Sequence, residues 1–131
     1  QITFNTVSIF ALNFKIFKLM RQVKWTGIYP AVTTKFKANG DLDIPAFLKN
    51  IEYQVNAGID GVVIGGSLGE SSTITHEERL ELAKATLEDF GDKIDVILNI
   101  AEGSTRTAVD LVKKAEAIGV HGLMVLPPMM Y

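Results

Sequence analysis

Short apolar runs alternate along this chain with longer segments whose apolar residues recur at helical spacing. The runs at residues 62–64, 96–100 and 122–126 are nearly unbroken and rich in branched aliphatic side chains. Such runs are typical of strands buried on both faces of a parallel sheet. Residues 27–34 are predicted to form a first strand at the rim of the sheet, because they include Pro30.

The segments between these runs predict three helices, over about residues 43–58, 75–91 and 104–119. The second begins with Thr75-His76-Glu77-Glu78, a capping box in which Thr75 caps the helix and Glu78 reaches back to it. We expect its first-turn histidine to be exposed. The side chains of this helix expected to face the core are Leu80, Ala83, Leu87 and Phe90.

Two junctions between a helix and a strand are nearly copies of each other. Residues 57–62 (AGIDGV) and 118–123 (IGVHGL) share the order helix end, glycine, β-branched residue, polar residue, glycine and strand. A repeat of about 30 residues implies parallel strands with right-handed crossovers. His121 occupies the polar position of the repeat, so we expect it to have a structural role in the loop.

Two architectures accommodate four such units: a doubly wound sheet, or half of a (β/α)₈ barrel, which needs about 250 residues. The chain has neither a G-x-G-x-x-G nor a G-x-x-x-x-G-K-[ST] motif. No helix follows the strand predicted at residues 122–126. We therefore predict an α/β fold made of the first four βα units of a TIM barrel, truncated after strand four.

Residues 1–22 do not follow this repeat. Asn13 and Lys15 interrupt their apolar run, which is too short to span a bilayer, and the basic residues follow it, unlike in a secretory signal. We expect a native start at Met20, with residues 1–19 an upstream extension. We expect residues 1–22 to lie outside the fold and residues 23–131 to form the N-terminal half of the barrel domain. An amphipathic N-terminal helix is the alternative.

Composition argues against nucleic-acid, membrane and metal binding. The formal charge of −2 provides no electrostatic footprint for nucleic acid or an anionic membrane. The absence of cysteine excludes disulfides and thiolate metal sites, and the two histidines, His76 and His121, lie far apart in sequence. We therefore expect no metal, and a cytoplasmic protein.

Residues 61–72 (GVVIGGSLGESS) are the strongest candidate for a binding site. Their apolar run breaks into a glycine-rich turn, Gly65-Gly66-Ser67-Leu68-Gly69, in which the missing side chains permit positive φ and a close approach to a small ligand. In parallel α/β proteins ligands bind at the carboxyl ends of strands, where this turn would lie. A tight turn without a ligand is the alternative.

Three motifs occur in order: AVTTKF after the first predicted strand, GGSLGES after the second and VLPP after the fourth. Together they resemble the dihydrodipicolinate synthase / N-acetylneuraminate lyase family over residues 25–131. GGSLGE is similar to that family's G-[ST]-[ST]-G-E signature, and THEER follows at the family's distance. The resemblance implies a cofactor-free (β/α)₈ lyase, usually a tetramer, in which a lysine forms a Schiff base with pyruvate or another 2-oxo acid.

The resemblance also implies that the signature turn binds the carboxylate of the 2-oxo acid. The matching residues are Ser67 and Leu68, whose backbone N–H groups would face the anion, with Gly66 and Gly69 permitting the turn. Leu68 replaces the second hydroxyl residue of the signature. Glu70 is expected to stabilise the loop rather than act as a base.

By the same resemblance, the acid/base tyrosine and the Schiff-base lysine belong to strands five and six, beyond Tyr131. Met129 and Met130 stand where synthases have paired tyrosines, so Tyr131 is a candidate for the proton relay, and residues 99–103 replace a glycine-rich loop. We expect a lyase fragment that is inactive alone. The alternatives are a non-catalytic α/β module that binds a small anion and a different half-barrel enzyme, such as a phosphate-binding one.

Overall fold

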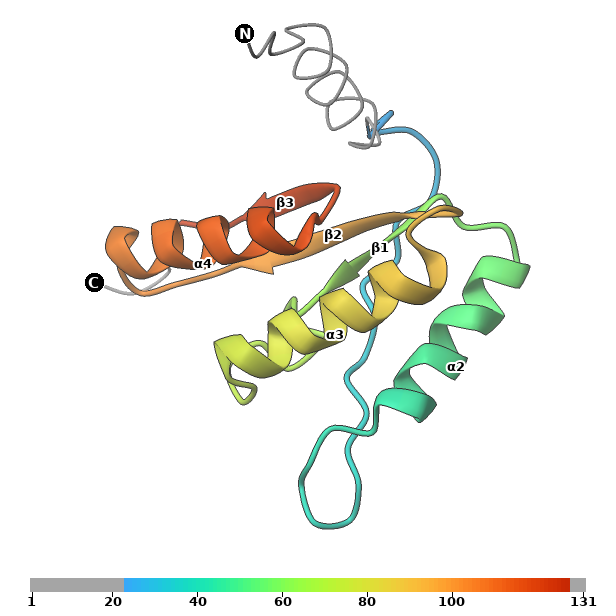
Figure 1. Ribbon diagram of the computed structural model, residues 1–131, viewed down its shortest axis with the longest axis horizontal. Coiled ribbons are helices and arrows are strands. Elements are labelled where there is room, and N and C mark those ends of the chain that lie inside the picture. Colours follow the sequence, from blue (N-terminus) through green and yellow to red (C-terminus); the bar gives the residue numbers. More distant parts are fainter. Residues whose placement is uncertain (1–22, 128–131) are drawn as a thin grey trace, which may run out of the picture.

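The computed structural model describes residues 23–127, which form helices alternating with parallel strands (Figure 1). The sheet has the order β1-β2-β3, and both pairs are parallel, with Leu98 opposite Ile64 on one side and Leu123 on the other. The predictions for residues 1–22 and for Tyr131 lie outside the described residues. In chain order the elements are α2 (Ile44–Asn56), β1 (Gly61–Ile64), α3 (His76–Phe90), β2 (Asp95–Ile100), α4 (Thr105–Ile118) and β3 (Gly122–Val125).

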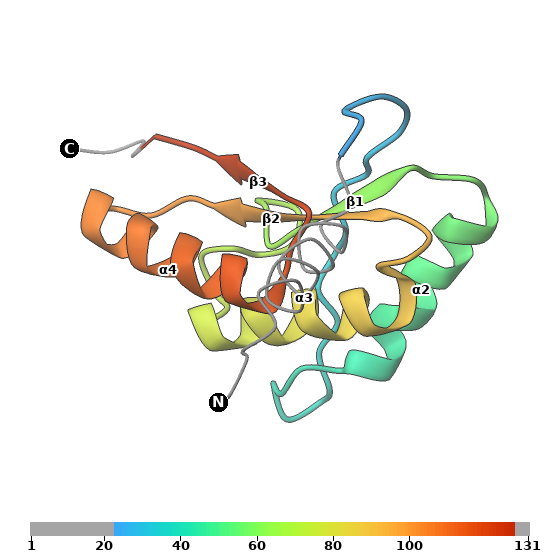
Figure 2. The same ribbon diagram turned by 45° about the horizontal axis from the view of Figure 1, so that its top comes forward.

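The three helices lie on one face of the sheet (Figure 2), and the hydrophobic core fills the space between them. Every residue of the central strand β2 is buried. Because side chains alternate along a strand, Ile97 and Asn99 point to the face opposite the helices. The largest buried side chains of the core come from both layers: Phe47, Ile51, Ile64, Leu82, Ile94, Leu98, Ile100 and Leu111.

The strand predicted at residues 27–34 is reduced to an isolated parallel bridge between Ala31 and Val63. Around this bridge, Val63 N–H donates to Pro30 O at 2.9 Å and Val32 N–H donates to Val63 O at 3.1 Å. The next bridge toward the N-terminus would need an N–H at Pro30, which proline lacks. The segment runs beside β1 as expected, but a single bridge does not make it a strand.

The helix boundaries agree with the predictions because each depends on a local cap. Thr75 and Glu78 of α3 form the capping box, and Ser104 Oγ accepts from Thr107 N–H at the start of α4. Gly119 ends α4 in the left-handed conformation at φ +83°.

The buried face of α3 differs from the prediction. Leu80 and Leu87 are only partly buried against the core, whereas Ala83 and Phe90 are buried as expected. The helix also buries Leu82 and two polar side chains, Arg79 and Thr86. Arg79 Nη2 donates to Ser71 O and Thr86 Oγ1 donates to Leu82 O, and such hydrogen bonds allow polar residues to face a core, so the apolar pattern identified only part of this face.

The two copied junctions perform the same task in the fold. Asp60 Oδ2 accepts a hydrogen bond from Ile28 N–H at 2.8 Å, and His121 Nδ1 accepts one from Val96 N–H at 3.0 Å. Each polar side chain thereby binds the backbone of the preceding extended segment. The predicted structural role of His121 is confirmed.

Candidate functional site

The signature turn begins where β1 ends, at the carboxyl edge of the sheet (Figure 1). Gly65 takes φ +67°, in the left-handed region, and so turns the chain out of the strand. The turn is then closed by its own backbone, with Gly69 N–H donating to Gly66 O at 2.9 Å and Glu70 N–H donating to Ser67 O at 3.1 Å. The site predicted from the glycine pattern is therefore a compact loop at the edge where ligands of parallel α/β proteins bind.

The four predicted binding residues divide into two buried glycines and two exposed donors. Gly66 and Gly69 are buried, and a Cβ at Gly69 would lie 2.9 Å from Val32 O. Ser67 and Leu68 are exposed, and within residues 23–127 their backbone N–H groups donate to no acceptor. Adjacent free N–H groups on a glycine-rich turn are suited to an anion.

Two buried side chains tether the turn from neighbouring segments. Thr34 Oγ1 donates to Gly69 O at 2.7 Å, and Asn99 Nδ2 donates to Gly65 O at 2.9 Å. A buried carbonyl costs free energy unless it is hydrogen-bonded, so these bonds favour the observed shape of the turn. Neither residue was among the predicted site residues, although Asn99 interrupts an otherwise apolar run and so gave a signal.

An ionic cluster joins the turn to the loop after β2. Arg79, only 2% exposed, donates from Nη2 to Ser71 O at 2.9 Å and from Nη1 to Glu102 Oε1 at 2.9 Å. The other oxygen of Glu102 lies 2.8 Å from His76 Nε2. The side chain of His76 is 32% exposed and bound to Glu102, so the expectation of an exposed histidine was wrong.

Glu70 also departs from ordinary backbone geometry, with φ +59°. Its carbonyl accepts from the hydroxyl of Thr73 at 3.0 Å and from the backbone N–H of Ile74 at 3.3 Å. These contacts belong to the backbone of Glu70, so the role expected for its carboxylate stays a prediction.

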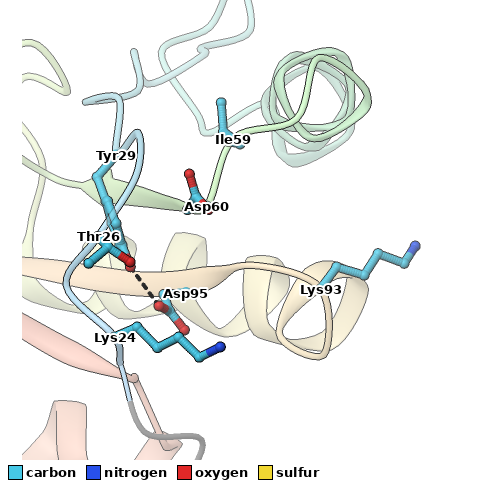
Figure 3. Close-up of a pocket in the computed structure, with 7 residues that line it drawn as sticks. All are labelled: Lys24, Thr26, Tyr29, Ile59, Asp60, Lys93 and Asp95. Carbon is cyan, nitrogen blue, oxygen red and sulfur yellow. Dashed lines mark hydrogen bonds between the residues drawn. The ribbon is translucent and has the colours of Figure 1, made fainter.

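A hollow of about 190 Å³ lies at the opposite edge of the sheet, where β1 and β2 begin (Figure 3). There the Tyr29 hydroxyl donates to Asp95 Oδ2 at 2.7 Å, and Asp60 already accepts from Ile28 N–H. The side chain of Lys93 points away from the other lining residues (Figure 3). Polar contacts here join the first extended segment to the strands, so the carboxyl-edge turn is the stronger candidate.

The described residues contain no cluster of three or more histidine, aspartate or glutamate side chains placed to hold a metal ion. None of the helices within residues 23–127 combines the length and the apolar character needed to cross a membrane.

The model of the Dihydrodipicolinate synthetase family matches residues 24–131. Among curated proteins, the 4-hydroxy-tetrahydrodipicolinate synthase of Moorella thermoacetica is 39% identical, over 81% of this chain and 36% of the relative. An uncharacterized DapA-like lyase of Rhizobium meliloti is 38% identical, over 79% of this chain and 35% of the relative.

Solved structures show the same relationship. The dihydrodipicolinate synthase of Aquifex aeolicus is 31% identical with a TM-score of 0.77, covering 81% of this chain and 36% of that one. YagE, an E. coli K12 prophage protein of the same family solved in complex with pyruvate, is 31% identical with a TM-score of 0.78, covering 83% and 37%. This chain spans about a third of the length of these relatives. Over residues 24–131, the chain belongs to the dihydrodipicolinate synthetase family.

Proposed function

We propose that the full-length protein is a lyase that forms a Schiff base with pyruvate or another 2-oxo acid, and that the signature turn binds the carboxylate of this substrate. The observation that carries the proposal is that the N–H groups of two exposed residues, Ser67 and Leu68, donate to no acceptor within residues 23–127, at the carboxyl edge of a parallel sheet. The relative YagE, crystallised with pyruvate, supports the substrate class.

The proposed chemistry divides between this turn and the remainder of a (β/α)₈ barrel. A lysine amine attacks the ketone carbon, and loss of water yields an iminium ion. The iminium accepts electrons from the adjacent carbon, which can then lose a proton and form or break a carbon–carbon bond. The turn would hold the carboxylate next to this ketone and so orient it for attack. The lysine and the acid/base tyrosine are assigned to parts of the relatives' length that residues 24–131 do not match.

Leu68 bears on the reaction within this class. Its side chain offers no hydroxyl at a signature position that most often has one, so Ser67 and the backbone would orient the anion. This turn is compatible with a synthase and equally with another 2-oxo acid lyase or a dehydratase. From the family resemblance we further propose a cytoplasmic homo-oligomer, a tetramer when full length.

The test is trapping with borohydride in the full-length protein, which reduces a Schiff base to a stable secondary amine. Incubation with pyruvate and borohydride is expected to add one reduced pyruvate to one lysine outside this chain's sequence, as read by mass spectrometry. Ser67→Ala removes one hydrogen bond to a charged group, worth about 1.5–3 kcal/mol, and should raise the half-saturating pyruvate concentration at least tenfold.

Ser72→Ala is the matched control, because Ser72 is an exposed serine just after the turn. It should leave the pyruvate dependence unchanged. No adduct on any lysine would contradict the Schiff-base chemistry, and an unchanged half-saturating concentration for Ser67→Ala would show that the turn does not hold the carboxylate.

A further inference from the structure

We propose that Arg79 is a positioning residue for the 2-oxo acid: anchored by Glu102, it holds the signature turn in the shape that presents Ser67 and Leu68 to the carboxylate. This inference rests on the proposed function and adds residues from α3 and from the loop after β2. Within residues 23–127 Arg79 donates to Ser71, Asn99 and Glu102 and not to either donor residue, so it acts through the backbone of the turn.

The aliphatic stem of Arg79 supports the beginning of the turn. A Cβ on Gly65 would lie 2.7 Å from both Cγ and Cδ of Arg79 and 3.2 Å from its Nε. The arginine stem thus packs against Gly65, in the space that any larger residue would need. Because Gly65 is also where the chain leaves β1, this contact fixes the direction in which the turn starts.

The guanidinium group holds the chain just after the same turn. Nη2 donates to Ser71 O at 2.9 Å, while Nη1 donates to Asn99 O at 3.3 Å. Gly65 and Ser71 lie on either side of the donors Ser67 and Leu68, so one side chain contacts both ends of the loop of residues 65–71. It also ties that loop to β2, whose Asn99 amide binds Gly65 O.

Glu102 keeps this arginine in place. The two side chains are 3% and 10% exposed, and their ion pair of 2.9 Å supplies the partner that a buried charge requires. His76 binds the other carboxylate oxygen of Glu102 and so restricts its orientation. Lysine could not replace this arrangement, because a single ammonium lacks the planar fork that serves Ser71, Asn99 and Glu102 together.

The experiment compares two ketones that differ in charge. Pyruvate and its neutral amide, pyruvamide, both offer a ketone to the Schiff-base lysine, but only pyruvate offers a carboxylate to the turn. The full-length wild-type protein and its variants are titrated with each ketone under borohydride, and the ratio of half-saturating concentrations gives the preference for the carboxylate. A general loss of stability would affect both ketones, whereas a misplaced turn affects the ratio.

We expect Arg79→Lys to lower the preference for pyruvate about tenfold, with the half-saturating pyruvamide concentration changed less than about twofold. Glu102→Gln retains the shape of the side chain and should lower the preference by a smaller factor, about threefold. Arg106→Lys is the matched control, because Arg106 is an exposed arginine in the first turn of α4, and it should retain the wild-type ratio.

A wild-type ratio in Arg79→Lys would overturn the inference. If Arg79→Lys does not fold, a wild-type ratio in Glu102→Gln would overturn the inference instead. A wild-type protein that forms adducts with both ketones but shows no preference for pyruvate would also overturn it, while leaving Schiff-base formation standing. A wild-type protein that forms no adduct with either ketone would refute the proposed function and the inference together.

Discussion

Replacing Gly65 by alanine tests whether the turn depends on a missing side chain at its first residue. At φ +67° an alanine pays the left-handed penalty, about 1–2 kcal/mol. Its Cβ would also meet Cγ and Cδ of Arg79 at 2.7 Å, and overpacking of this kind costs about 1–3 kcal/mol. Arg79 cannot move away freely, because Ser71 and Glu102 hold its guanidinium. The expected loss of stability is about 2–5 kcal/mol.

Gly40→Ala is the matched control for this substitution. Gly40 takes φ +91°, also in the left-handed region, but nothing lies within 4 Å of a Cβ built there. Gly40→Ala should cost only the conformational penalty of about 1–2 kcal/mol. Urea unfolding of the full-length variants measures the stability of Gly65→Ala and Gly40→Ala, taken from the midpoint at unchanged m. If Gly65→Ala costs no more than Gly40→Ala, the contact between Arg79 and the turn does not constrain residue 65.

Three further substitutions test separate contacts. Thr34→Val leaves the buried Gly69 carbonyl without its 2.7 Å hydrogen bond and should cost about 1–3 kcal/mol in urea unfolding, whereas a loss below about 0.5 kcal/mol would show that the tether is weak. Leu68→Thr restores a hydroxyl of the signature and should lower the half-saturating pyruvate concentration in borohydride trapping; an unchanged or higher value would contradict the proposed carboxylate site. The hydrogen bond from Lys114, at 3.1 Å, lowers the pKa of the Glu77 carboxyl, so this pair favours the folded state above the ordinary glutamate pKa and loses that effect as pH falls through the lowered pKa. Lys114→Met should return the pKa of Glu77 toward its ordinary value in an NMR titration, and an unmoved pKa would refute that cause.

Most of the fold follows from signals that lie within a few residues of the element they define. The capping box at Thr75, the cap at Ser104 and the terminal Gly119 all act on neighbouring backbone groups, so reading the chain locally is sufficient to locate α3 and α4. The first strand was overestimated because one missing N–H at Pro30 breaks a ladder whose other strand is far along the chain. That effect depends on register with β1, which local patterns do not reveal.

The candidate site likewise has a part that local sequence predicts and a part that depends on distant residues. The glycine pattern identifies the turn itself, since positive φ and close packing are properties of single residues. Its supports come from distant positions: Thr34 is 35 residues from Gly69, Asn99 is 34 from Gly65, and Glu102 is 23 from Arg79. The first extended segment beside β1, the pairing of β1 with β2 and the packing of α3 bring these groups together, so no local pattern could pair them.

The most direct measurement is a crystal structure of the full-length protein with pyruvate reduced onto its lysine by borohydride. The turn is predicted to hold the carboxylate, with oxygens about 2.7–3.2 Å from the N–H groups of Ser67 and Leu68 and within similar reach of Ser67 Oγ. The Arg79 contacts to Ser71 and Glu102 should be retained in that complex. A trapped pyruvate whose carboxylate lies against another loop, with the N–H groups of Ser67 and Leu68 facing solvent, would contradict the proposed site.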